Sequence, residues 1–323
     1  MSSRRIVDPG GALFGLLLPA LAAVGGTLLT KIWEPRLPAE IATHWTTTSP
    51  DGFAPPMSSA WAFAIVILLI GGGCCSFASL AGGQLLIRRI MLLIGLTVVG
   101  LTVTVQVTLL TVQLDETSGA DTELPTSAMG LGMLIGTALG LVGAAALRDY
   151  RVRVPATKRP DPDLPRRPTS ELPVTDDVGF GAVGSGVLIL LVVAPALWLS
   201  TVVGTWWILA VFVPILLLIL AVLRFRVIVD GSGIRVVNMG MTSIAYGIDE
   251  VEGVRVDEIK PFDDFGGWGL KTKGPRNYGV VTRSGPALIL TTACGDRLTV
   301  TSPKAEEMAG VLNSLADQRA TYP

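Results

Sequence analysis

Charged side chains are scarce in this sequence of 323 residues, since Asp, Glu, Lys and Arg make up 16% of it, against about 25% in ordinary soluble domains. The 25 basic and 26 acidic residues nearly cancel, which argues against nucleic-acid binding through bulk positive charge. A hydrophobic share of 50% argues against a disordered chain. The apolar excess must therefore lie outside a single water-soluble core.

Histidine and cysteine are scarcer still, with one His and three Cys. Cys74 and Cys75 are adjacent and Cys294 lies far from them, so the chain has no Cys-x-x-Cys pair and no His/Cys cluster. These absences argue against a structural zinc site, and we expect neither a metal nor a cofactor. No nucleophile motif accompanies the single histidine, so we also expect no catalytic residue.

The missing charges leave five long uncharged stretches, at residues 9–30, 52–87, 90–114, 124–147 and 178–223. About 20 apolar residues cross a bilayer as a helix, and the last stretch is long enough for two helices and a turn. The sequence therefore predicts a bundle of six transmembrane helices, near residues 11–30, 60–82, 90–113, 127–147, 182–202 and 205–224.

Basic residues are distributed unequally between the loops that connect these helices. With a cytoplasmic amino terminus, the outer loops receive Lys31 and Arg36 alone. The inner segments receive Arg4, Arg5, Arg88, Arg89, Arg148, Arg151, Arg153, Lys158, Arg159, Arg166, Arg167, Arg224 and Arg226. This asymmetry predicts a multi-pass plasma-membrane protein with both termini in the cytoplasm.

Small and polar residues lie on defined faces of two of these helices. Gly132, Gly136 and Gly140 are spaced by four and predict close helix packing, within the chain or in a homodimer. The third helix carries a stripe of threonines that includes Thr104 and Thr108. Their hydroxyls are expected either to form hydrogen bonds with helix backbone or to line a polar pathway. The predicted spans hold no ionisable residue, and such residues usually mark ion-coupled transporters.

The first outer loop contains the single histidine, in a segment that runs from Leu37-Pro38 through His44-Trp45 to Asp51-Gly52-Phe53. His44, Trp45 and Asp51 are candidate ligand-binding residues, although packing against Trp45 is the simpler role for His44. The segment resembles the signature of the "domain of unknown function 1648" membrane proteins, which include the SdpI-type immunity proteins. That resemblance implies a membrane protein without an assigned biochemical activity.

From Arg226 onward the composition is that of a soluble domain. Alternating apolar residues predict seven strands, at 226–229, 234–237, 243–246, 251–256, 279–282, 287–292 and 297–301. Ser302 can cap a final amphipathic helix. The order of the strands and helix, with the segment Asp264-Phe265-Gly266-Gly267-Trp268-Gly269, resembles the pleckstrin-homology-like (PH-like) tails of actinobacterial membrane proteins. The resemblance implies a small barrel closed by the helix.

Lys271, Lys273, Arg276 and Trp268 are candidates for contact with lipid headgroups or a protein partner, because bases near a membrane attract anionic lipid. The domains expected are a membrane region at 1–114 with the signature loop at 31–59, an outer loop and fourth span at 115–147, a basic Pro-rich linker at 148–177, a transmembrane hairpin at 178–225 and the PH-like domain at 226–323.

The sequence favours a non-enzymatic membrane protein that senses, protects or recruits a partner through its outer loop and its inner domain. A small-solute transporter or channel is the alternative, and a membrane enzyme is the third. The expected partners are the lipid bilayer and a cytoplasmic or membrane protein that binds 226–323, without nucleic acid.

Overall fold

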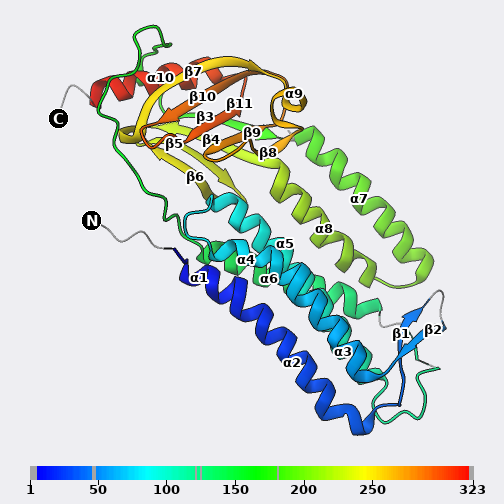
Figure 1. The fold of residues 1–323 in the computed structure, drawn as a ribbon. Helices are drawn as coiled ribbons and strands as arrows, with labels where there is room; N and C mark the ends of the chain where they lie inside the picture. Colours follow the sequence, from blue (N-terminus) through cyan, green and yellow to red (C-terminus); the bar gives the residue numbers. More distant parts are fainter. Residues whose placement is uncertain (1–5, 46–48, 121, 124–125, 180–181, 320–323) are drawn as a thin grey trace. The chain divides into compact units, whose positions relative to one another are not determined.

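The computed structural model of the chain describes residues 6–45, 49–120, 122–123, 126–179 and 182–319. Its contacts divide the chain into two units (Figure 1). Unit 1 holds residues 1–151 and 189–218, and unit 2 holds residues 152–188 and 219–323. The helices α7 (Ala182–Val203) and α8 (Trp207–Leu223) each contribute to both units.

Long apolar helices form most of unit 1. They are α1 and α2 (Pro9–Ala12, Leu18–Trp33) joined by a π-helical turn at Leu13–Leu17, α3 and α4 (Pro56–Ile65, Gly73–Ser76) joined by π-helical Val66–Gly72, α5 (Leu85–Val112) and α6 (Thr126–Ala146). Among the described residues, five helices including α7 are long and apolar enough to cross a membrane, whereas α8, with 17 residues, is shorter. The predicted long apolar helices are confirmed and are compatible with a membrane region, and the number of spans stays a prediction.

The pair α5 and α6 packs so closely that glycine is needed along the contact. A Cβ built on Gly132 would lie 2.6 Å from the carbonyl oxygen of Gly100, and one on Gly136 would lie 2.8 Å from the Cα of Thr97. At Gly140 the corresponding distance to the Cα of Leu93 is 2.9 Å. All three glycines therefore face α5 of the same chain.

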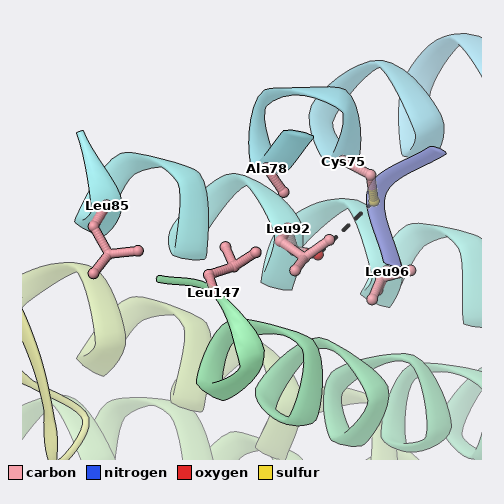
Figure 2. Close-up of a cluster of buried hydrophobic side chains, with 6 residues drawn as sticks. All are labelled: Cys75, Ala78, Leu85, Leu92, Leu96 and Leu147. Atoms are coloured by element: carbon pink, nitrogen blue, oxygen red, sulfur yellow. Dashed lines mark hydrogen bonds between the residues drawn. The ribbon is translucent and has the colours of Figure 1, made fainter. Parts of the chain in front are cut away.

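Buried apolar side chains fill the space between the start of α5, the end of α6 and α4 (Figure 2). The cluster consists of Cys75, Ala78, Leu85, Leu92, Leu96 and Leu147, with Phe14 and Leu18 packed against it. The thiol of Cys75 donates to the carbonyl oxygen of Leu92 at 3.9 Å. Cys75 thus serves as a small core residue, as adjacent cysteines in an apolar helix usually do.

Unit 2 contains two β-sheets. The first has the order β3-β4-β5-β6 and is antiparallel, with strands Val174–Gly179, Arg224–Asp230, Gly233–Asn238 and Met241–Gly247. The second has the order β7-β10-β11-β9-β8, with strands Val251–Ile259, Gly285–Thr292, Arg297–Thr301, Asn277–Val281 and Gly269–Thr272. A β domain is confirmed, and its closure into a PH-like barrel stays a prediction. The sequence missed β3 and β8.

The first sheet begins before the helical hairpin, which differs from the domain start expected at residue 226. Strand β3 pairs with β4 from Val174 opposite Val229 to Gly179 opposite Arg224. Since α7 follows β3 and α8 precedes β4, the hairpin of two helices is an insertion between neighbouring strands of one sheet. The ion pair Asp177–Arg226, at 2.7 Å, joins the two strands beside the helices.

Helix α10 (Ala305–Arg319) packs against β7 and β10 and also holds the segment expected to be a free linker. The amide of Asn313, which is fully buried, bonds to both backbone polar groups of Val254, at 2.9 and 2.7 Å, and donates to the carbonyl of Pro165 at 3.0 Å. Arg166 pairs with Asp317 at 2.7 Å. Residues near 165 are therefore fastened to the β domain.

Candidate functional site

The outer-loop candidates lie on a two-stranded hairpin formed by β1 (Ile41–Trp45) and β2 (Pro50–Ala54). His44 lies opposite Gly52 in the register. A Cβ on Gly52 would approach the Cβ of His44 to 2.8 Å, so glycine is required there. The Nδ1 atom of His44 lies 2.6 Å from Oδ1 of Asp51, and both side chains are largely exposed, at 71% and 45%. The pair presents an imidazole and a carboxylate to the outside of the hairpin.

Trp45 fixes the end of this hairpin. Its indole Nε1 donates to the carbonyl of Thr122 at 2.9 Å, which ties β1 to the loop between α5 and α6. The ring is half-buried. The structure therefore brings all three sequence candidates, His44, Trp45 and Asp51, onto one hairpin, where Trp45 serves as an anchor and the other two remain accessible.

Gln113, at the end of α5, makes a second and deeper attachment. Its side-chain oxygen accepts from the backbone N–H of Ala42 at 2.6 Å, and its Nε2 donates to the carbonyls of Ala42 at 3.3 Å and Leu109 at 2.9 Å. Gln113 and Ala42 are both fully buried. A side-chain amide that pairs with a buried strand backbone is costly to remove. Gln113 therefore fixes the position of the hairpin relative to the end of α5.

An exposed ion pair closes the same end of unit 1. Arg36 donates through Nε to Asp115 at 2.9 Å and through Nη2 to its second carboxylate oxygen, while the N–H of Asp115 donates to the carbonyl of Arg36 at 2.7 Å. The hydrogen bonds from Arg36 hold the pKa of Asp115 below its ordinary value of 3.8. The other outer base, Lys31, pairs with Glu34 at 2.6 Å. Both outer bases are thus matched by carboxylates.

This end of the bundle presents a platform of exposed hydrogen-bonding groups. Its accessible groups are the His44–Asp51 pair on a hairpin that three contacts hold in place. Among the described residues, no group of three or more His, Cys, Asp or Glu side chains has a metal-binding arrangement. We take the platform as the candidate binding site of this end of unit 1.

The candidates of the β domain separate into two places. Lys271 belongs to β8, and Lys273 follows that strand with its Nζ 5.9 Å from the ring centre of Phe265. Arg276 instead donates to the carbonyl of Cys294 and lies 3.9 Å from Asp296, so it braces the turn between β10 and β11. Trp268 is 59% exposed and lies before β8.

Two threonines of the α5 stripe, Thr97 and Thr104, are used in helix packing. The hydroxyl of Thr97 donates to the carbonyl of Leu93 at 2.8 Å and lies 3.1 Å from the hydroxyl of Thr137 on α6. A Cβ on Gly132 would come within 2.9 Å of the Cβ of Thr104. These two threonines face α6, which occupies the space that a polar pathway on this side of α5 would need.

A buried ion pair at the opposite end of unit 1 is the feature that sequence reasoning missed. Arg88 and Asp8 are exposed by only 2% and 1% and pair through Nη2. Arg88 also donates to the carbonyls of Ala78, at 3.1 and 2.8 Å, and Arg148, at 3.0 Å. Asp8 accepts from the N–H groups of Gly10 at 2.9 Å and Arg148 at 3.2 Å. The pair therefore joins the starts of α1 and α5 to the end of α6.

Comparisons with protein-family models, curated proteins and solved structures give no significant match. The resemblances to the domain of unknown function 1648 proteins and to PH-like tails therefore stay predictions from the residues that carry them.

Proposed function

We propose that the chain is a non-enzymatic multi-pass membrane protein that exposes the β1–β2 hairpin outside the cell and holds the β domain in the cytoplasm. The distribution of bases in unit 1 supports this orientation. Arg88, Arg89 and Arg148 gather at one end, where Arg89 donates to the carbonyl of Ala144 at 2.8 Å. The hairpin end carries Lys31 and Arg36, each with an acidic partner. Cationic ends of membrane helices face the cytoplasm.

The chain path supports the proposal that the β domain lies on the same side of the membrane as these arginines. Helix α6 ends at Ala146, next to Arg148, and the chain continues through residues 152–171 into β3 without another apolar helix. Helices α7 and α8 leave from β3 and return to β4. Since β3 and β4 are neighbours in one sheet, both ends of this hairpin lie on one side of the membrane.

We further propose that the domain recruits a protein partner in response to the state of the membrane helices. One observation supports this proposal. The β domain is attached to the helices through two paired strands rather than through a single linker. Strand β3 precedes α7 in the chain, α8 leads directly into β4, and Asp177 and Arg226 bridge the two strands at 2.7 Å. We expect a shift of one helix along the other to strain this pairing, which would carry a change from the bilayer into the sheet.

The orientation is tested by reporter fusions. Fusions after Asp51, Arg159 and Pro323 should report outside, inside and inside. A fusion after Arg159 that reports outside would overturn the proposed placement of the β domain.

Recruitment is tested by photo-cross-linking in intact cells with the full chain. A photoreactive residue at Glu252 or Glu258, both exposed on the edge strand β7, should give a discrete protein adduct. The matched control is Leu190 on α7, which is 66% exposed on an apolar helix and should contact lipid alone. If the β7 positions give no more protein adduct than position 190, the recruitment proposal fails while the orientation still stands.

A further inference from the structure

Two aromatic rings project from unit 2 beside the start of β8. Phe262 lies in α9 (Pro261–Phe265) and is 63% exposed, and Trp268, which follows that helix, is 59% exposed. Their ring centres are 5.1 Å apart, with the planes at 73°. Aromatic side chains of this size usually bury most of their surface. The pair is therefore an apolar surface that the packing of unit 2 leaves uncovered.

A pocket of about 290 Å³ lies next to this pair, and Trp268 forms one of its walls. Its other lining residues are Gly179, Leu223, Gly269 and Thr282. The described lining residues, one leucine, one tryptophan, one threonine and two glycines, include no charged side chain. Such walls suit an apolar ligand better than a polar one.

The position of the pocket within unit 2 indicates what reaches it. Gly179 is the last residue of β3 and Leu223 is the last residue of α8, and a Cβ on Gly179 would collide with the carbonyl oxygen of Leu223. The apolar sequence of α8 continues to Leu223 itself, directly before Arg224. At the root of α7, Val183 is 82% exposed. The pocket thus opens where the helices enter the bilayer.

We propose that the segment from Pro261 to Gly269 is a membrane-interface anchor and that the pocket beside Trp268 binds an acyl chain of a bilayer lipid. Trp is the side chain most typical of the headgroup level, because its ring is apolar and its N–H stays hydrated. On this proposal the exposed apolar side chains of Phe262, Trp268 and Val183 all face lipid. One lipid leaflet therefore covers all three.

Charge does not select the lipid at this place. Lys271 follows the anchor by two residues and Arg224 follows the lining residue Leu223, but Asp263 and Asp264 on α9 offset these bases. Asp264 also accepts from the backbone N–H of Lys260 at 2.8 Å. The apolar walls of the pocket therefore recognise the lipid, and the part that they bind is the hydrocarbon chain that all phospholipids share. This inference requires α7 and α8 to be membrane helices and is independent of partner recruitment.

The test uses the full chain in phosphatidylcholine nanodiscs that contain a tracer phosphatidylcholine with a diazirine on its acyl chain. After illumination and digestion, mass spectrometry should find lipid adducts on the peptide that contains Trp268 at least about tenfold above those on β7, residues 251–259. Thr282→Leu should remove most of that adduct by filling the pocket, because Thr282 lines it. Thr272→Leu, on the exposed end of β8, is the matched control and should leave the adduct unchanged.

Equal labelling of the Trp268 and β7 peptides would overturn the proposal, as would labelling that Thr282→Leu leaves intact. If Trp268 formed adducts with a protein instead of a lipid in cell membranes, the surface would belong to a protein partner. That result would also overturn the proposal. A Trp268→Ser variant provides a second test in case the Thr282→Leu protein does not fold. It removes one wall of the pocket at an exposed position and should lower the amount of lipid adduct similarly.

Discussion

The buried pair of Asp8 and Arg88 allows a quantitative test of the packing of unit 1. The perturbation is Asp8→Asn, which keeps nearly the same shape. Asparagine is as good an N-cap as aspartate, so the bonds from the first turn of α1 are retained. The change therefore removes the carboxylate charge and leaves Arg88, which is 2% exposed, without its counter-charge.

Breaking a buried pair in this way costs about 3–5 kcal/mol. Arg88 keeps three hydrogen bonds to carbonyl groups, at 3.1, 2.8 and 3.0 Å, so we expect a loss near the lower end, about 3 kcal/mol. Adding Arg88→Met to Asp8→Asn removes the stranded charge and should restore part of the loss. That recovery distinguishes an unpaired charge from general damage to the packing.

Unfolding of the purified protein in mixed micelles, followed by tryptophan fluorescence, measures the free energy. Glu34→Gln is the matched control, because it removes the exposed pair with Lys31, whose side chain is 66% exposed. That loss should stay within about 1 kcal/mol. If Asp8→Asn costs no more than Glu34→Gln, the pair is not buried as described and the reasoning is refuted.

Three further predictions concern unit 1. Gly136→Leu should destabilise the protein by about 1–3 kcal/mol in the same assay, because α5 fills the space beside it; an unchanged stability would contradict the close contact. Gln113→Leu leaves the buried backbone of Ala42 unpaired at a cost of about 1–3 kcal/mol. Hydrogen exchange at Ala42 should therefore accelerate roughly tenfold or more. Unchanged exchange would contradict the attachment of the hairpin by Gln113. The pKa of Asp115 is lowered by hydrogen bonds from Arg36, so the stabilising effect of the pair is present above pH 3.8 and is lost as the pH falls through the lowered pKa. Asp115→Asn should therefore be as stable as the wild type at acid pH and less stable at neutral pH. An equal difference in stability at the two pH values would contradict this prediction.

The long apolar helices could be predicted because their signal is local. The run from Ile90 to Leu114 contains no charge, and a helix is the form that satisfies its backbone in lipid. The predicted strands of the β domain followed from residue alternation and turns such as Asp230-Gly231-Ser232-Gly233. These patterns repeat within a few residues, so no knowledge of distant partners was needed.

Strand β3 could not be predicted for the opposite reason. Its sequence Val-Thr-Asp-Asp-Val-Gly is short and acidic and follows a proline-rich segment. What makes it a strand is pairing with β4, about 45 residues later and beyond two apolar helices. The charge count likewise assigned Arg88 to a loop, whereas it lies in the first turn of α5, where Asp8 neutralises it.

The candidate sites were only partly readable from the sequence. His44 and Asp51 were chosen from their residue types, and their 2.6 Å contact follows from the register of a hairpin that alternation alone did not reveal. Lys271, Lys273 and Arg276 were grouped because they are close in the chain. The turn at Arg276 sends its side chain toward Cys294 and breaks up that group.

The opposite placement of the outer hairpin and the β domain is the central claim, and cysteine accessibility measures it most directly. In a chain with Cys74, Cys75 and Cys294 replaced by alanine, single cysteines at the exposed positions Glu40 and Glu258 are treated with a membrane-impermeant maleimide. In intact cells Glu40→Cys should be labelled, and Glu258→Cys should be labelled only after the membrane is permeabilised. Labelling of both positions in intact cells, or of Glu258→Cys alone, would contradict the account.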